Sequence, residues 1–400
     1  MDFYIQQAHG MQTIISEFAE KWKSGTVILS PTDMDQKRLV PYAQSLNKKG
    51  MKTVIDPQCY SFHASKNKLI SQSYWINNYV TSLFDSESIR WQLHELKSKY
   101  YDNFDSPFFI VPFPLITDVN EMIYSMLELY FTCIDSMDIN NPYISIPLCS
   151  DVIIDEKKMH LLLEYLEMFA FKGIYLVPAH PGGNYLVDNP VWLANIMDFC
   201  AGVKLSGKKV VVGYSNHQSL ILGVAKVDAI ASGNFLNSRS FSLEKFSVPL
   251  EGDNFRNKSI WFYSPQTLSE YQILYLDMAR KIGSLEKLKP AEFFLFEEVT
   301  ALFSGAQPTS VNFPERFAFV HYLNSLKIQS EQLVLDTFEK TYANIKLLFE
   351  SAQVIASELH DQGVRAKNRD YLTVYDATMS AIDQFGLNRG LVMKVDWDNL

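Results

Sequence analysis

Eight short apolar runs alternate with helix-forming segments in the first 235 residues, and this alternation limits the folds open to the chain. Each run is rich in Val, Ile, Phe and Tyr, which is typical of strands buried on both faces of a parallel sheet. The predicted strands are 3–7, 25–31, 52–57, 107–114, 142–148, 173–179, 209–214 and 228–233. The predicted helices between them include 11–24, 115–135, 155–173, 190–207 and 216–226.

Eight strand–helix units in about 240 residues predict an α/β fold, a (β/α)8 TIM barrel. A doubly wound open sheet is the alternative, and one local feature argues against it. The segment after the first predicted strand, QQAHGM (6–11), lacks the GxGxxG loop that opens many dinucleotide-binding sheets.

The pattern changes near residue 245. Segments 265–305 and 314–385 place apolar residues three and four apart, which is the spacing of amphipathic helices. Gly363 ends the longest of these stretches. We therefore expect a barrel over 1–245 and a mostly helical C-terminal extension over 246–400.

Charge and cysteine content exclude several classes of protein. The net charge of −9 argues against broad nucleic-acid binding, which needs a dense Lys and Arg surface, although one local basic groove stays compatible with it. The four cysteines include no CxxC pair, so neither a Cys-rich zinc site nor a disulfide framework is expected. No signal peptide and no run of about 18 apolar residues is visible, so we expect a soluble, cytoplasmic protein without membrane association.

Polar side chains follow the predicted strands at the ends where a barrel of this type carries its active site. Amides outnumber charges among them. Because Asn and Gln both donate and accept hydrogen bonds, this mixture suits a neutral heterocycle or sugar better than a polyphosphate. The predicted ligand-binding residues are Gln58, Tyr60, Gly182, Gly183, Asn184, Tyr214, Ser215, Asn216, Ser232, Gly233, Asn234, Asn237 and Arg239.

Asp56 and His180 are the candidate catalytic residues. Asp56 ends the third predicted strand and precedes Pro57, which restricts the Asp56 backbone and fixes how the carboxylate is presented. The carboxylate can act as a general base or hold the ring N–H groups of a base, and a turn-stabilising role is the alternative. His180 precedes Pro-Gly-Gly and is a candidate acid, base or stacking partner, with a structural role in the loop as the alternative.

No metal or cofactor is predicted, because local spacings typical of metal ligands are missing from the sequence. If a metal were bound, Asp56, His180 and His217 would be its ligands. Cys59 is a weaker candidate nucleophile, since no basic residue stands near it in the sequence.

Three segments carry a resemblance to the tRNA-guanine transglycosylase family. The run KTVIDPQCYSFH (52–63) resembles the family's segment in which a strand ends in Asp. The run KKVVVGYSNHQSLILGVAKVDAIASGNFLNSRSF (208–241) resembles its last barrel segment, where the final loop bears Asn-x-Arg, here Asn237-Ser238-Arg239. The stretch from residue 316 is similar to the family's helical C-terminal part.

The resemblance implies a transglycosylase-like barrel that binds a guanine or 7-deazaguanine base, with Asp56 matching the acid/base Asp. The family exchanges bases through a covalent sugar–enzyme intermediate on a second Asp. Here Asp228 matches the first Asp of that strand, but the nucleophile position holds Ala231 or Ser232. Because no Cys follows Cys200, the family's zinc motif is also missing, and ordinary tRNA base exchange is not expected.

Three hypotheses follow. The first is an enzyme acting on a deazaguanine-type base or its conjugate, with Asp56 as acid/base and Asp33 or Asp151 replacing the lost carboxylate. The second is a catalytically silent barrel that binds a base, or a protein carrying one, as a scaffold or binding subunit of a larger assembly, either with a protein from the same operon or as a homodimer. By analogy with specialised relatives, that operon would be of the CBASS antiviral or deazaguanine DNA-modification kind. The third is an unrelated lyase or hydrolase with a metal at Asp56 and His180.

Overall fold

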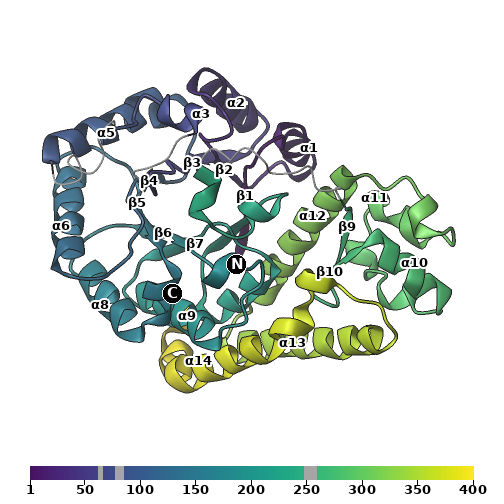
Figure 1. Cartoon of the computed structure of the whole chain (residues 1–400). Coiled ribbons are helices and arrows are strands. Elements are labelled where there is room, and N and C mark those ends of the chain that lie inside the picture. The colour runs from purple at the N-terminus through teal and green to yellow at the C-terminus, as the bar shows by residue number, and fades with distance from the viewer. Residues whose placement is uncertain (62–65, 77–84, 247–258) are drawn as a thin grey trace.

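The computed structural model describes residues 1–61, 66–76, 85–246 and 259–400, and a large parallel sheet dominates this part of the chain (Figure 1). The strand order β3-β2-β1-β8-β7-β6-β5-β4 places sequence neighbours side by side and joins the first strand to the last. The predicted (β/α)8 TIM barrel is therefore confirmed. The strands are β1 (Asp2–Gln6), β2 (Thr26–Leu29), β3 (Lys52–Ile55), β4 (Phe109–Val111), β5 (Pro142–Leu148), β6 (Gly173–Pro178), β7 (Lys209–Val212) and β8 (Ala229–Ser232).

A side chain joins β3 and β4, where the described residues form no backbone ladder. Tyr101, in the 3-10 helix η1 (Tyr101–Asn103), places its hydroxyl between the two strands. The hydroxyl donates to the Ile55 carbonyl at 2.9 Å and accepts from the Ile55 amide at 3.3 Å and from the Ile110 amide at 3.0 Å. One phenol thus satisfies backbone groups that a closed barrel would pair with each other.

Helices wrap the outside of the barrel (Figure 1). Several begin at a side chain that accepts hydrogen bonds from first-turn amides, such as Asp35, Asp85 and Asn120. The helix predicted over 155–173 ends earlier, at Glu167, because residue 173 already belongs to β6. The outer helices are α1 (Gln12–Trp22), α2 (Gln36–Lys48), α3 (Asn67–Ile70), α5 (Ser86–Lys99), α6 (Glu121–Asp135), α7 (Ser150–Ile154), α8 (Glu156–Glu167) and α9 (Pro190–Leu205).

The C-terminal helices complete the outer layer beside β7, β8 and β1. After β7 the chain forms the 3-10 helix η3 (His217–Ala225) in place of a long α-helix. α12 (Glu315–Leu333) packs against β1 and η3, while α13 (Phe338–Asp361) and α14 (Tyr375–Asp396) pack against η3. Figure 1 shows these green and yellow helices lying against one side of the barrel. The helices of the C-terminal part therefore belong to the helical layer that surrounds the barrel strands.

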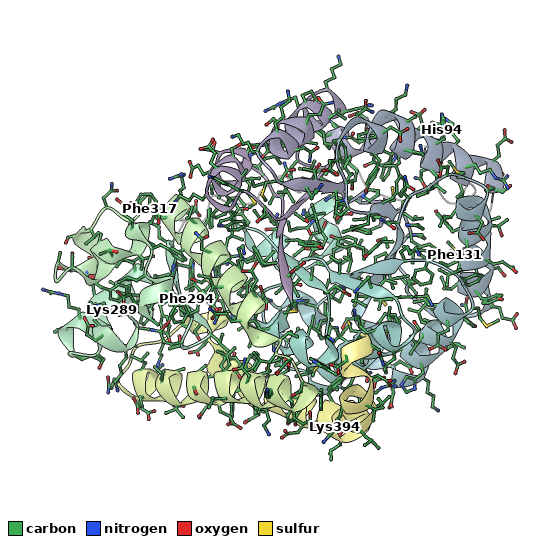
Figure 2. All side chains as sticks on the ribbon, turned by 180° about the vertical axis from the view of Figure 1, so that it is seen from behind. His94, Phe131, Lys289, Phe294, Phe317 and Lys394 are labelled. Atoms are coloured by element: carbon green, nitrogen blue, oxygen red, sulfur yellow. The ribbon has the colours of Figure 1, made fainter. Side chains whose placement is uncertain are left out.

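A β-hairpin is the main departure from the expected helical extension. β9 (Trp261–Ser264) pairs antiparallel with β10 (Ser269–Gln272), so the helix expected from residue 265 is wrong for that segment. Helix begins at Ile273 with α10 (Ile273–Lys281), followed by the short α11 (Glu297–Thr300). Together with α12 and α13 these elements enclose a second small core, and Figure 2 shows Phe317, which packs against it, across the molecule from Phe131. In the described part of the chain, no helix has the length and apolar character needed to cross a bilayer.

Candidate functional site

Asp56 lies fully buried just after β3, inside the mouth of the barrel. The Tyr60 hydroxyl donates to its Oδ1 at 2.5 Å, as does the Gln58 amide at 3.0 Å. On the other oxygen, Oδ2, the Tyr214 hydroxyl donates at 2.9 Å and the Tyr175 hydroxyl lies 3.3 Å away. Because Tyr175 comes from β6, on the far side of the barrel, the carboxylate faces the barrel interior. We call these five residues the Asp56 cluster.

The backbone is strained at two members of the cluster. Gln58 has φ 56° and Tyr214 has φ 52°, in the left-handed region that residues with a side chain rarely adopt. Next to Tyr214, Gly213 gives Tyr175 its space, since a Cβ at residue 213 would lie 2.4 Å from the Tyr175 hydroxyl. Strain of this kind persists only where surrounding contacts hold it, and it is common at ligand-binding sites.

The ionisation of the cluster follows from its burial. Burial raises the pKa of Asp56, and the hydrogen bonds from Tyr60, Tyr214 and the Gln58 amide offset part of that rise. Burial also raises the pKa of Tyr60, Tyr175 and Tyr214 well above the usual tyrosine value, so all three stay protonated donors. Burial thus favours the protonated form of Asp56, while its hydrogen-bond donors favour the carboxylate.

Gln58 connects the cluster to the end of β2. Its side-chain oxygen accepts from the Thr32 hydroxyl at 2.6 Å and from the Thr32 amide at 2.9 Å. Its Nε2 donates to the Ser30 hydroxyl at 2.9 Å, and Ser30 donates to Asp33 at 2.8 Å. Asp33 therefore lies in the same network as Asp56, and it is partly exposed. Asp151, the other proposed replacement carboxylate, is exposed in α7.

Aromatic rings cover the cluster. Phe241 meets Tyr60 edge-on at 5.1 Å and Tyr214 at 5.3 Å between ring centroids, and Phe246 meets Tyr60 at 5.5 Å. Lys245, between these two phenylalanines in the sequence, places its ammonium 4.7 Å from the Tyr214 ring centroid. Burial lowers the pKa of Lys245, while the charges of Asp33 and Asp56 raise it.

A cleft of about 930 Å³ lies on the other side of Phe241. Acidic, amide and hydroxyl side chains line it together with several apolar ones, and Lys and Arg are missing from its described lining. It is therefore suited to neutral or cationic ligands and unsuited to polyphosphates. The lining residues are Leu115, Cys149, Ala179, His180, Gly182, Gly183, Asn184, Tyr185, Leu186, Asp188, Leu236, Asn237, Ser240, Phe241, Ser242, Leu243, Glu244, Asn368, Thr373 and Val374.

His180 lies at the edge of this cleft, with Gly182, Gly183 and Asn184 in the same loop. Its Nδ1 lies 2.9 Å from the Asn184 carbonyl, and its ring meets Trp192 edge-on at 5.4 Å. Burial lowers the pKa of His180 to about 4, so the imidazole is neutral at neutral pH. The hydrogen bond to the carbonyl makes Nδ1 the protonated nitrogen and leaves Nε2 as an acceptor.

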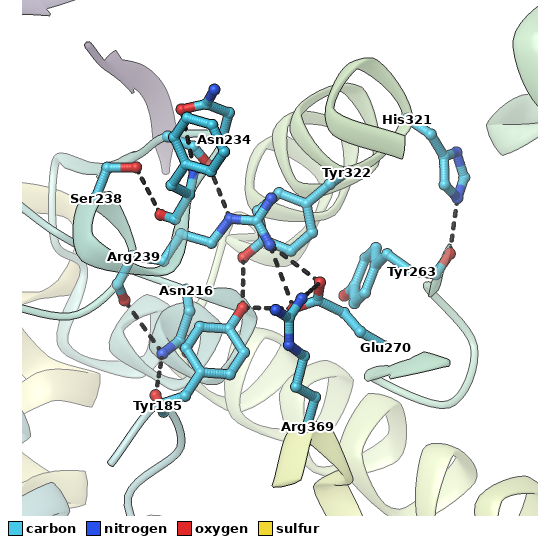
Figure 3. A network of polar contacts seen from close by, with 12 residues as sticks. Tyr185, Asn216, Asn234, Ser238, Arg239, Tyr263, Glu270, His321, Tyr322 and Arg369 are labelled. Atoms are coloured by element: carbon cyan, nitrogen blue, oxygen red, sulfur yellow. Dashed lines mark hydrogen bonds and ion pairs between the residues drawn. The ribbon is translucent and has the colours of Figure 1, made fainter. Parts of the chain in front are cut away.

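Arg239 belongs to a separate buried network that joins the barrel to the hairpin (Figure 3). Its Nη1 lies 3.1 Å from Glu270 Oε2 in β10, and its guanidinium stacks 3.3 Å from the Tyr322 ring centroid. Tyr185 donates to Glu270 at 2.7 Å, and Arg369 binds the same carboxylate at 2.7 Å. The predicted ligand-binding arginine therefore has its charge neutralised inside the protein.

The other predicted residues divide between loop structure and the cleft. Asn216 caps η3 and donates to the Tyr185 carbonyl at 2.7 Å, and the Ser215 hydroxyl donates to the Val212 carbonyl at 3.0 Å. Asn234 accepts from the Phe235 amide at 3.0 Å.

Gly233 allows a close approach, since a Cβ there would lie 2.5 Å from the Gln6 carbonyl. Ser232 is fully buried at the end of β8, while Asn237 lines the cleft.

Within the part of the chain that the structure describes, β8 carries no carboxylate at its mouth end. Asp228 precedes the strand, at the opposite end of the barrel, where it binds the ammonium groups of Lys204 and Lys209 at 2.9 Å each. Ala231 and Ser232 occupy the mouth end and are both fully buried. Asp228 is thus a structural ion-pair partner.

The metal hypothesis gains no geometric support. Asp56 lies in its tyrosine cluster, His180 at the cleft and His217 beside Tyr185 and Tyr263 in the Arg239 network. Across residues 1–61, 66–76, 85–246 and 259–400, no three potential metal ligands lie together. Cys59 is buried, with its thiol 3.6 Å from the Pro57 carbonyl.

Sequence reasoning missed Tyr175, Lys245 and Glu270. Tyr175 lies within a predicted strand of otherwise apolar residues, so its hydroxyl does not stand out in the sequence. Because alternate residues of a strand point to the same face, the register that starts at Gly173 could have placed the Tyr175 side chain inside the barrel. Lys245 and Glu270 lie outside the segments that directly follow the predicted barrel strands. Comparisons of the chain with family models, with curated proteins and with solved structures found no match.

Proposed function

We propose that the protein binds a guanine- or 7-deazaguanine-type base, or a conjugate of one, at the mouth of the barrel between the cleft and the Asp56 cluster. The observation that carries the proposal is the chemistry of the cleft, whose described lining offers amides, hydroxyls, a neutral imidazole and two carboxylates without a Lys or Arg side chain. A planar base with several N–H and C=O groups matches such a lining.

Asp56 supports the same ligand class. In its ionised form the carboxylate can accept two hydrogen bonds, from the adjacent ring N–H and amino groups of guanine. Because Phe241 separates the cleft from Asp56, the base reaches the carboxylate only if this ring moves aside. Binding then replaces the tyrosine hydrogen bonds of Asp56 with bonds to the ligand.

Calorimetric titration with guanine, 7-cyano-7-deazaguanine and 7-aminomethyl-7-deazaguanine tests the proposal. Since Asp188 and Glu244 line the cleft, we expect the cationic aminomethyl compound to bind about two- to fivefold tighter than the cyano compound, and salt to reduce the difference. Asn237→Leu should weaken binding about three- to tenfold, whereas Asn388→Leu, on the exposed side of α14, should not. No binding of any of the three bases would overturn the proposal.

A binding subunit without turnover is the second candidate. It is favoured by the mouth end of β8, which carries Ala231 and Ser232 where covalent sugar chemistry needs a carboxylate. Assays of base exchange and of glycosidic hydrolysis separate the two functions. Turnover that is abolished by Asp56→Asn would favour the enzyme, while base binding without turnover, together with co-elution with an operon partner, would favour the subunit.

A further inference from the structure

Three buried donors at the barrel mouth have no hydrogen-bond partner among the described residues. They are Nε2 of Gln6, Nε2 of Gln7 and Nζ of Lys245. Both glutamines are fully buried. An unpaired buried donor costs free energy, more so when it carries a charge, and proteins seldom retain one without a use.

The two glutamines connect directly to the Asp56 cluster. Gln6 Oε1 lies 3.0 Å from the Tyr175 hydroxyl, which has one hydrogen to share between Gln6 and Asp56. Gln7 Oε1 accepts from the Ser30 amide at 3.2 Å, and Ser30 is bonded to Gln58. In each glutamine the oxygen is used by the protein and the amino group is left over.

Lys245 completes the set from the loop above. Its ammonium faces the Tyr214 ring at 4.7 Å, and the Tyr214 hydroxyl donates to Asp56. A lysine whose role is to neutralise Asp56 or Asp33 would form an ion pair with one of them. Within the described residues the Lys245 ammonium has no hydrogen-bond acceptor, although the charges of Asp33 and Asp56 act on it from nearby.

We propose that Lys245, together with Gln6 and Gln7, binds a carbonyl oxygen of the ligand and so selects bases that carry an oxo group. The inference rests on the proposed function and adds the residue that donates a hydrogen bond to the carbonyl oxygen of the base. Asp56 takes the N–H side. Lys245 is thus a specificity-determining residue that no strand-end pattern indicates.

Titration of guanine and 6-thioguanine into wild type and Lys245→Met tests this. Both compounds keep the ring N–H and the amino group, but sulfur is a weaker acceptor than oxygen. We expect Lys245→Met to weaken guanine binding about tenfold or more and 6-thioguanine binding much less. Lys208→Met is the matched control, because Lys208 also lies over an aromatic ring, 4.9 Å from Phe171, at the other end of the barrel.

The outcomes are separable. Wild type that binds neither base overturns the proposed function itself. Wild type that binds guanine, with an equal loss for both bases in Lys245→Met, overturns only the role of Lys245. Thermal unfolding gives a second readout: removing an unpaired buried ammonium should raise Tm, and a lowered Tm would show that Lys245 is structural and contradict the inference.

Discussion

The Tyr60 hydroxyl lies 2.5 Å from Asp56 Oδ1, the shortest of the contacts that this carboxylate makes. The two residues are four apart, and the Pro57–Gln58 turn, with its left-handed Gln58, brings them face to face. Phe241 and Phe246 cover the pair with apolar rings. A short hydrogen bond in an apolar setting keeps the carboxyl group in place while burial opposes its charge.

Asp56 should make wild type lose stability as pH rises. Its folded pKa lies above the unfolded value of 3.8, so the folded state holds the proton longer, and stability falls from about pH 4 up to the folded pKa. The Asp56→Asn variant has no group that ionises at this position, so its stability should not fall in this way. The difference in unfolding free energy, Asn variant minus wild type, should therefore increase with pH when urea unfolding is measured at pH 4, 6 and 8.

Tyr60→Phe is the companion variant for that series. It removes one donor to the carboxylate, so the Asp56 pKa should rise further and the loss of stability should extend to higher pH. A difference between Asp56→Asn and wild type that stays constant with pH would show that Asp56 titrates at its ordinary pKa.

Glu270 should give the opposite pH dependence. Burial raises its pKa, but Arg239 and Arg369 outweigh burial and lower it to about 2. The ionised Glu270 side chain therefore stabilises the folded state fully above pH 4.5. This contribution to the unfolding free energy, on the order of 3 kcal/mol, is lost as pH falls from about 4.5 toward about 2. Glu270→Gln should destabilise the protein by about 3–5 kcal/mol near pH 7, because the buried Arg239 and the partly buried Arg369 lose their partner.

The loss of unfolding free energy caused by Glu270→Gln should become smaller as the pH of the urea unfolding experiment is lowered from 5 to 3. Glu20→Gln is the control, since Glu20 pairs with Lys49 on the surface and is worth less than about 1 kcal/mol. Equal effects of the two substitutions would contradict the assignment of Glu270 as the joint between barrel and hairpin.

Tyr101→Phe should weaken the joint between β3 and β4. The substitution leaves the backbone groups of Ile55 and Ile110 without the hydroxyl, at a cost of about 1–3 kcal/mol. Urea unfolding gives the magnitude, and hydrogen exchange should be faster at these two amides. Tyr74→Phe, which removes one hydrogen bond to the Pro57 carbonyl, should lower the unfolding free energy by less.

Gly213→Ala should disrupt the Asp56 cluster. The new methyl group would lie 2.4 Å from the Tyr175 hydroxyl, so Tyr175 or β7 must move, at a cost of about 1–3 kcal/mol. Gly390→Ala in α14 is the control, because the nearest atom to its Cβ is 3.5 Å away, and a helical alanine should stabilise by up to about 1 kcal/mol. Equal melting temperatures for Gly213→Ala and wild type would contradict the close packing.

The barrel was predictable because its strands are short, apolar and evenly spaced, and the strand predicted over 142–148 matches β5 residue for residue. The hairpin was not, although Pro265 lies at its turn, because WFYS and SEYQ are too short to distinguish from helix by spacing alone.

The site was predictable where chemistry follows a strand end, as for Asp56, Gln58 and Tyr214. Arg239 shows the limit of this reasoning. Its loop position indicated a ligand, but its partner Glu270 lies 31 residues further along, on the hairpin. A pairing of that kind depends on how distant segments pack, and no local pattern encodes it.

The hydrogen bonds of the Tyr101 hydroxyl between β3 and β4 also affect the tendency of the protein to aggregate in a crowded solution. Strands at an open sheet edge present unpaired N–H and C=O groups to other chains, which is a route to aggregation. Among the described residues, β3 and β4 are the two barrel strands without a laddered neighbour on one side. The Tyr101 hydroxyl, together with the hydrogen bond from the Thr53 amide to the Asp105 carbonyl, occupies groups of the strand that leads to Asp56 and leaves fewer of them open to pairing with a second molecule.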